Sequence, residues 1–498
     1  MTQDTKYQES VDEYQTDNSQ SRLMSWPYIK GYLAVSGVIL FIVLIYHLST
    51  GIPQNMGPRD GGRPPFGGAP IGGMMPGGFS DIWPLWGQIV IPTLGGFLLG
   101  ILAVSVVTLT IWYVYEKREK IPRWFFVALF GFAVIVLTNL FQGWTTGIYE
   151  PIGGASEIFQ DAININNVIQ FISNFVILQP SLSLHAQTQP PGAVLTIYFL
   201  YQIFGSADLI ALGLAAIATF ASAFFLDMIF SSRLDNDSAR YGVLLFLLLP
   251  AVQVYYLANL YAIVATLMFG SIYFYQHQNQ YISVIGSTLL IFLGTFTSFL
   301  FVYIGIFLLI YEISRTGNPM KVGLVDWIKS FAKNASRLMI IVLLVGAIYS
   351  ILYLVLGFNY LNAFLFASAL ENPGGFMLFS NPVNYIVTRF EDALDIAIFF
   401  GPVLLYLCWK GIKHIKENDV ENYKFTLSAF VALFILFLTG APKKGETARI
   451  CMFFLPFMLI PVLAYIKSMN ISKRDRVILA VVVFIQAVIM QLFGTYIW

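Results

Sequence analysis

Long apolar runs, separated by short polar segments, recur from Ile29 to the C-terminus. Each run approaches the roughly 20 residues that an α-helix needs to cross the hydrocarbon core of a bilayer. Backbone groups inside lipid have no water to bond, so each run is expected to be helical. The pattern predicts thirteen membrane spans, at 28–49, 86–115, 123–142, 207–230, 240–258, 261–275, 281–296, 297–314, 338–357, 391–409, 425–440, 449–467 and 477–496.

The polar segments between these runs predict three domains. Residues 1–27 form a polar, acidic tail that does not resemble a cleavable signal peptide. Residues 28–115 form a pair of spans around the Gly/Pro-rich segment 50–85, which is expected to be a surface loop. Residues 116–498 form the main transmembrane domain, in which 358–390 is expected to lie at the membrane interface as short amphipathic pieces.

Composition supports a lipid environment and excludes other classes of protein. With 57% hydrophobic and 11% charged residues, and a mean hydropathy of +0.72, the chain has too little polar surface to cover a soluble globule of its length. The net charge of +1 argues against nucleic acid as a partner. Cys408 and Cys451 are interpreted as packing residues, since two cysteines make no disulfide framework.

Basic residues predict the orientation, because Lys and Arg favour cytoplasmic loops. With the N-terminus in the cytoplasm, 22 of the 28 Lys and Arg residues fall on the cytoplasmic side. The chain is therefore expected to be a multi-pass plasma-membrane protein with an extracytoplasmic C-terminus. The six basic residues placed outside are Arg59, Arg63, Arg389, Lys443, Lys444 and Arg449.

The large outer loop, 143–206, carries the candidate chemistry. Its first part contains Glu150, Glu157 and Asp161 but no Lys or Arg to pair with them. Long connectors in compact membrane proteins are usually functional. A helix from Ser156 to Phe175 would put Glu157 and Asp161 on one face and would carry an apolar stripe toward the membrane. That stripe consists of Ile158, Ile165, Val168, Ile169, Ile172, Phe175 and Val176.

The acids also have an ordinary interpretation, as the solvated face of an outer loop. His185 adds to the functional interpretation, because it precedes Pro190, Pro191 and the apolar run 193–204, which is too short to span. That run is expected to be a juxtamembrane helix that begins at the prolines. The alternative role for His185 is a capping side chain at this turn.

A second cluster lies where the twelfth predicted span enters the membrane. It consists of Lys443, Lys444, Glu446 and Arg449, so half of the outer basic residues gather here, against the usual bias. Cationic side chains and backbone N–H groups at a helix N-terminus can bind phosphate together. The alternative is an interfacial anchor in which Glu446 pairs with Arg449. Glu391, Asp392 and Asp395, with Arg389 as a partner, begin the tenth predicted span on the same side.

Three segments together resemble the GT-C superfamily of membrane glycosyltransferases, which includes protein O-mannosyltransferases and aminoarabinose transferases. The first is the acidic outer loop, and the second is HAQTQPPGAVLTIYFLYQIFGSADL, with a His, a Pro-Pro-Gly and a short helix before the next span. The third is GETARICMFFLPFML, similar to the Gly-Glu-x-x-Arg segment of several members. The acidic loop follows the third predicted span here, whereas in the family it commonly follows the first.

The resemblance implies a GT-C-like fold and the transfer of a sugar from a polyprenyl-phosphate donor to a glycan, lipid or protein acceptor. Asp161, Glu157 or Glu150 would be the base, because an acceptor hydroxyl must lose a proton during attack. Arg449, Glu446, Lys443, Lys444 and His185 would form the substrate-binding group. The outer loop 143–206 contains no Asp-x-Asp or Glu-x-Asp motif, so participation of a divalent metal ion stays open and no cofactor is assigned.

Two other functions are compatible with a polytopic chain. A transporter or lipid flippase usually shows internal repeats and ionisable groups near the middle of its spans, and the sequence shows neither clearly. A structural membrane subunit would tolerate neutralisation of all the outer acids.

Overall fold

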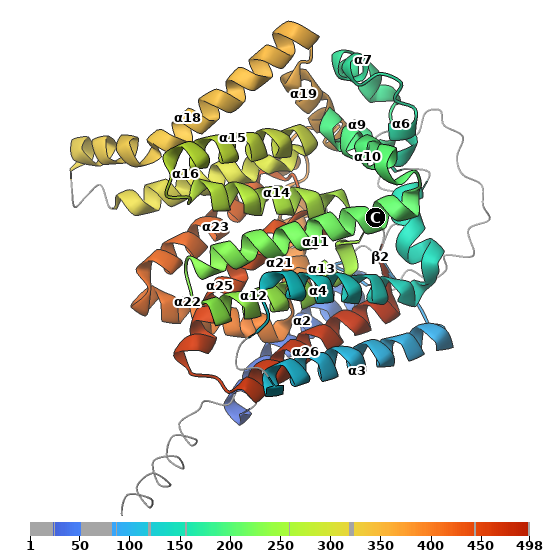
Figure 1. The fold of residues 1–498 in the computed structure, drawn as a ribbon, viewed down its shortest axis with the longest axis vertical. Coiled ribbons are helices and arrows are strands. Elements are labelled where there is room, and N and C mark those ends of the chain that lie inside the picture. The colour runs from blue at the N-terminus through green and yellow to red at the C-terminus, as the bar shows by residue number, and fades with distance from the viewer. Residues whose placement is uncertain are drawn as a thin grey trace, which may run out of the picture.

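The computed structural model describes residue 23 and residues 25–50, 82–85, 87–117, 121–154, 157–257, 259–317, 323–442 and 445–496. The fold is all-α and polytopic, with helices that run side by side through one bundle (Figure 1). Among these residues, nine helical segments are long and apolar enough to cross a membrane. They belong to α2 (Trp26–Thr50), α3 (Leu94–Lys117), α4 (Trp124–Asn139), α11 (Ala207–Ser231), α15 (Gln280–Thr297), α16 (Val302–Thr316), α18 (Leu324–Leu356), α23 (Val420–Thr439) and α26 (Lys473–Phe493).

Two further apolar helices meet at a sharp bend, which is the form of either a broken span or a re-entrant loop. Helix α21 (Pro382–Phe400) and helix α22 (Pro402–Asn418) are bent by 101° relative to each other. Gly401 lies between them with φ +97°, which side-chain-bearing residues rarely adopt. A Cβ atom there would also lie 2.6 Å from Oε1 of Gln486. The bend therefore requires glycine.

The prediction of thirteen spans is not confirmed, because three predicted spans correspond to shorter helices. They are α12 (Asn236–Leu248) with α13 (Pro250–Tyr255), α14 (Leu260–Tyr275) and α25 (Leu455–Ser468). Pro250 interrupts the first of these, since proline has no N–H and clashes with the preceding turn. Every residue from Tyr241 to Leu257 is buried. Protein rather than lipid therefore surrounds this interruption, which makes a break at membrane depth tolerable.

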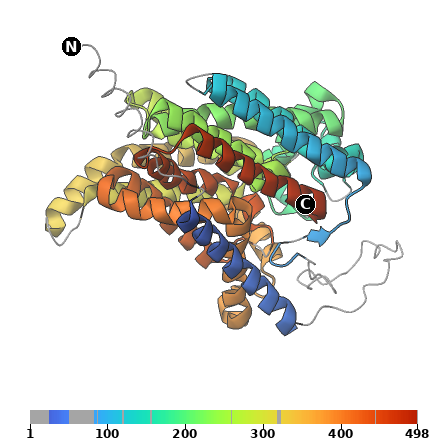
Figure 2. The same ribbon diagram turned by 90° about the horizontal axis from the view of Figure 1, so that it is seen from below.

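The ends of the bundle also differ from the prediction. Strand β1 (Gly87–Ile89) pairs antiparallel with β2 (Gly494–Tyr496), as Figure 2 shows near the C-terminal end. The span predicted from 86 therefore starts only at Leu94, because Pro92 disfavours helical backbone at the residue before it.

In segment 358–390, helices α19 (Tyr360–Glu371) and α20 (Met377–Ser380) precede α21.

The loop after α4 folds into short helices at one end of the bundle, which we call the loop end (Figure 1). The predicted continuous helix from Ser156 to Phe175 is wrong. The first helix of this segment ends at Ile163. A second helix begins after Asn167, whose side chain accepts a hydrogen bond from the N–H of Gln170, as N-cap residues do. The elements are η1 (Leu140–Gln142), η2 (Thr145–Tyr149), α5 (Glu150–Gly153), α6 (Phe159–Ile163), α7 (Val168–Ser173), α8 (Phe175–Leu178), η3 (Gln179–Ser181), α9 (Leu184–Gln187) and α10 (Pro191–Phe204).

Helix α10 has the position that the sequence analysis expected for a short helix beside the bundle. It starts at Pro191, ends at Gly205 with φ +74°, and packs against α11 and α15. The remaining short helices are η4 (Phe299–Phe301), α24 (Thr447–Ile450) and η5 (Met452–Phe454).

Candidate functional site at the loop end

Glu157 and His185 come together although they belong to different short helices of the loop. Glu157 lies two residues before α6, and His185 lies in α9. Nε2 of His185 is 3.7 Å from Oε1 of Glu157, and the two side chains are 32% and 18% exposed. The predicted acid and the predicted histidine therefore form a pair that solvent and a substrate can still reach.

Arg449 and Glu446 form a second pair at the start of α24. Nη2 of Arg449 lies 2.6 Å from Oε2 of Glu446, and the arginine side chain is only 7% exposed. Its guanidinium carbon lies 5.9 Å from the ring centroid of Tyr261, the second residue of α14. Nε of Arg449 has no hydrogen-bond partner within the described part of the chain. This Nε atom is itself buried, like the Nε atoms of Arg233, Arg240, Arg389 and Arg476 in the described chain, so it does not by itself mark a binding site.

Tyr261 connects the arginine to the loop. Its hydroxyl accepts a hydrogen bond of 3.0 Å from Nε2 of Gln189, the residue before Pro190 and α10. The sequence does not mark either residue as part of a site, because Tyr261 lies in an apolar run and Gln189 lies in a polar turn. Only the tertiary structure brings the start of α14 beside the loop.

The two pairs influence each other electrostatically. Burial raises the pKa of Glu157 to about 7, while Arg449 acts to lower it and Glu446 to raise it. A pKa near neutrality is what a general base needs at neutral pH. The groups predicted from residues 143–206 and from 443–449 therefore act on each other across almost 300 positions of the chain.

Asp161 points elsewhere. Its two carboxylate oxygens accept the backbone N–H of Ser183, at 3.0 and 3.2 Å. Ser183 is the N-cap residue of α9, so Asp161 fixes the turn that carries His185. The expectation that Glu157 and Asp161 share one helix face is corrected, because Glu157 precedes α6 and faces His185 instead.

The other predicted site residues are less informative. Glu150 begins α5 and is exposed. Lys443 and Lys444 lie outside the described residues.

The start of α24 is bound by acids of α21 rather than left open for an anion. The N–H of Ala448 donates to Oδ2 of Asp395 at 2.9 Å, and Oγ1 of Thr447 donates to Oδ1 of Asp392 at 2.5 Å. Asp392 also pairs with Arg389 at 3.0 Å. The expectation that phosphate binds backbone N–H groups here is therefore corrected for Ala448.

A third acid of α21 is bound in the same region. Oε1 of Glu391 accepts a hydrogen bond of 2.6 Å from Nε1–H of Trp83. Glu391, Asp392 and Asp395 are all fully buried. These acids hold the loop end together, and their bonding to α24 could not be read from the sequence.

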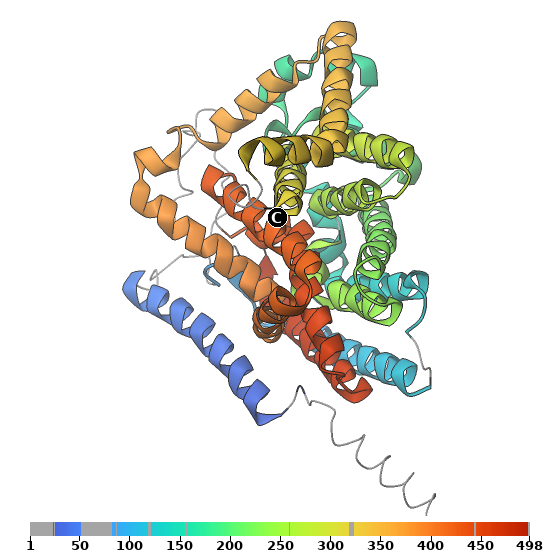
Figure 3. The same cartoon turned by 90° about the vertical axis from the view of Figure 1, so that its left-hand side faces the viewer.

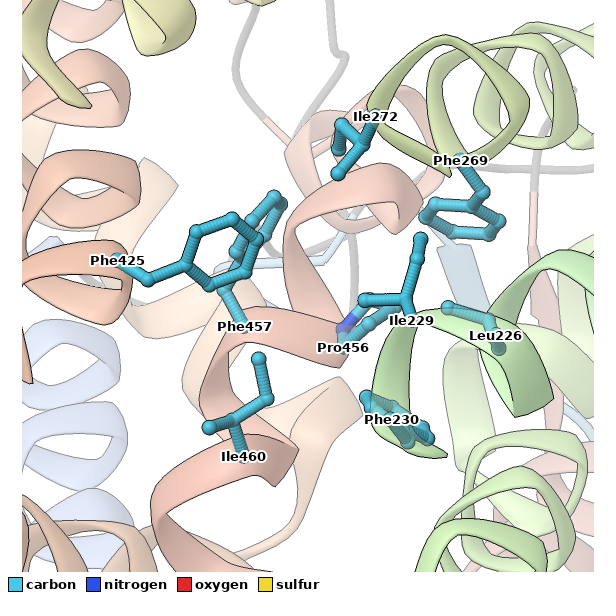
Figure 4. A pocket seen from close by; sticks show the side chains of 9 residues that line it. All are labelled: Leu226, Ile229, Phe230, Phe269, Ile272, Phe425, Pro456, Phe457 and Ile460. Carbon is cyan, nitrogen blue, oxygen red and sulfur yellow. The ribbon is translucent and has the colours of Figure 1, made fainter. Parts of the chain in front are cut away.

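A small apolar cavity lies deeper in the bundle, between α11, α14, α23 and α25 (Figure 4). Its lining contains no polar side chain and none of the candidate site residues; it consists of Leu226, Ile229, Phe230, Phe269, Ile272, Phe425, Pro456, Phe457 and Ile460. The cavity is a gap in the packing of the bundle and is separate from the candidate site.

In the described residues, no group of three or more His, Cys, Asp and Glu side chains is arranged to hold a metal ion. The divalent ion that the sequence analysis left open thus has no ligand set among them. No protein-family model, no curated protein and no solved structure matches this chain. Any function must therefore be argued from the geometry of Glu157, His185, Glu446 and Arg449.

Proposed function

We propose that this protein is a membrane glycosyltransferase of the GT-C type. It would transfer a sugar from a polyprenyl-phosphate-linked donor to a hydroxyl group of a lipid, glycan or protein at the extracytoplasmic face. The observation that supports the proposal is the electrostatic coupling of a half-buried carboxyl, Glu157, to a buried arginine, Arg449. Glycosyl transfer from a phosphate needs these two groups together.

Glu157 is the base in this proposal. The acceptor oxygen attacks the anomeric carbon and forms the new glycosidic bond, while its proton passes to the carboxylate of Glu157. The bond between the anomeric carbon and the phosphate oxygen breaks, and its electron pair leaves with the lipid phosphate. General base catalysis of this kind contributes roughly 10²–10⁴-fold to the rate.

Arg449 binds the departing phosphate. A donor phosphodiester carries one negative charge and the released monoester carries more, so positive charge stabilises the transition state. The planar guanidinium fork of Arg449 suits a phosphate. Glu446 holds the guanidinium in place through its 2.6 Å contact.

His185 and Asp161 have supporting roles. His185 contacts the base and orients it toward the acceptor. Asp161 holds α9 through the N–H of Ser183, and so positions His185. Among Asp161, Glu157 and Glu150, the partial burial of Glu157 and its neighbours His185 and Arg449 favour Glu157 as the base.

A transporter is the second candidate, because α21 and α22 meet at a sharp bend and carry three buried acids. Broken helices with ionisable groups are typical of transporter binding sites. Here, however, Trp83, Arg389, Thr447 and Ala448 bind these acids. An acid cluster occupied by the protein's own groups supports a structural role.

Comparative mass spectrometry of surface glycans and glycolipids tests the proposal. Cells that lack the gene are complemented with wild-type protein, with Glu157→Gln, or with the control Glu150→Gln, which changes an exposed acid of the same loop. We expect one sugar modification to be lost in the deletion and in Glu157→Gln, and restored by the wild type and by Glu150→Gln. A full restoration by Glu157→Gln at equal expression would reject Glu157 as the base.

A further inference from the structure

Three lysines gather where α2 crosses α22, at the end of the bundle opposite the loop end. Figure 3 shows α2 lying along α22. The crossing is close, since a Cβ atom on Gly31 would lie within 2.3 Å of the Tyr406 ring. Lys30 precedes this contact on α2, and Lys410 and Lys413 follow it on α22. Because the two helices run in opposite directions here, the three side chains belong to the same end.

Tyrosines hold the start of α2 in this position. The hydroxyl groups of Tyr28 and Tyr465 are hydrogen-bonded at 2.7 Å, and the rings of Tyr32 and Tyr406 pack edge to face at 5.5 Å. The N–H of Leu23 donates to Asp475 at 2.7 Å. The first turns of α2 are thus fixed, although most of this helix is exposed to the surroundings.

Each ammonium group lies over an exposed tryptophan. Lys30 is 5.3 Å from the ring centroid of Trp26, and Lys410 and Lys413 are 5.2 and 3.9 Å from that of Trp409. The two tryptophans are 62% and 50% exposed. Tryptophan favours the headgroup level of a bilayer, and cation–π contact holds the charges beside it.

Within the described ranges, none of Lys30, Lys410 and Lys413 forms an ion pair with a carboxylate. Two other basic groups at this end are ion-paired: Lys467 with Asp235 at 3.2 Å and Arg476 with Asp237 at 3.1 Å. Of the acids on neighbouring segments, Asp475 accepts the N–H of Leu23, and Glu417 is exposed.

We propose that the α2–α22 crossing binds the headgroup of an anionic phospholipid in the leaflet opposite the loop end. The phosphate would lie among the three ammonium groups, and the two indoles would pack against the glycerol region. The inference is independent of the proposed transferase activity.

Native mass spectrometry of the full-length protein tests this site. The protein is released from vesicles made of equal parts of phosphatidylglycerol and phosphatidylcholine, and the ratio of the two retained lipids is measured. We expect the wild type to retain phosphatidylglycerol selectively and Lys410→Gln/Lys413→Gln to lose this preference by roughly tenfold. Lys410→Arg/Lys413→Arg should keep it, which separates loss of charge from misfolding.

A matched control removes two lysines of α18 at the same end, Lys329→Gln/Lys333→Gln, of which Lys329 is already ion-paired with Asp326. This control should leave the ratio unchanged. An equal loss in the control, no loss in the Lys410/Lys413 variant, or displacement of phosphatidylglycerol by excess inorganic phosphate would each overturn the proposed lipid site.

Discussion

Glu157 combines partial burial with neighbours of both charges. Burial raises its pKa to about 7, with Arg449 opposing and Glu446 adding to the shift. The fold therefore favours the protonated carboxyl, so the stability that it contributes is present at low pH and lost as the pH rises through about 7. Glu157 loses its proton, and so becomes able to act as a base, over the same pH interval. It is therefore active as a base at the pH values at which it stabilises the fold least.

The pH dependence of transfer is set by these neighbours. We expect kcat/KM of the wild type to rise with pH and to reach half of its plateau near the pKa of Glu157, about 7. Glu446→Gln removes a negative neighbour that raises the pKa of Glu157. The rise of kcat/KM with pH, which is the acidic limb of the profile, should therefore move to lower pH. The measurement is a pH–rate profile with the polyprenyl-phosphate sugar identified by glycan analysis. Glu150→Gln is the control, and an unmoved limb in Glu446→Gln would disconnect Glu446 from the base.

At the scale of elements, α24 takes its position from α21. Thr447 and Ala448 bind Asp392 and Asp395, and Arg389 reaches the preceding turn by donating to the carbonyl of Pro442 at 3.2 Å. The position of Arg449 therefore depends on a helix that carries no proposed catalytic group.

Thr447→Val tests this dependence. Loss of the hydroxyl deprives the buried Oδ1 of Asp392 of its donor, which should lower the free energy of unfolding by about 1–3 kcal/mol and raise KM for the donor more than it lowers kcat. Thr426→Val is the matched control, because the hydroxyl of Thr426 on α23 is buried without a hydrogen-bond partner in the described chain. Denaturant titration and steady-state kinetics provide the two readouts. Equal effects of both variants would show that α24 does not depend on this bond.

At the scale of the whole molecule, the bundle separates two ends with different chemistry. The loop end carries the buried acids and Arg449, and the opposite end carries the lysines of α2, α18 and α22 (Figure 1). The charge bias of the sequence predicts that the loop end is extracytoplasmic.

Cysteine labelling of intact cells measures this orientation. Cys408 and Cys451 are buried, so they should not react with an impermeant maleimide. We expect the reagent to label Gln160→Cys, an exposed position of α6, and to leave Lys333→Cys on α18 unlabelled until the cells are permeabilised. The reverse pattern would invert the topology and exclude an extracytoplasmic active site.

The sequence alone determined the membrane class, most of the long helices and the region of the candidate site, because lipid imposes apolar runs and a helical backbone on every crossing. It also indicated Glu157, His185, Glu446 and Arg449, but it predicted Asp161 as the base ahead of Glu157 and Glu150. Tertiary structure decided how these groups meet: Asp161 turns to the N–H of Ser183, and Tyr261 bridges Gln189 and Arg449. It also decided where helices break, at Pro250 and Gly401. Periodicity reports only which residues avoid water, whereas hydrogen bonds between segments hundreds of residues apart depend on packing that no local pattern encodes.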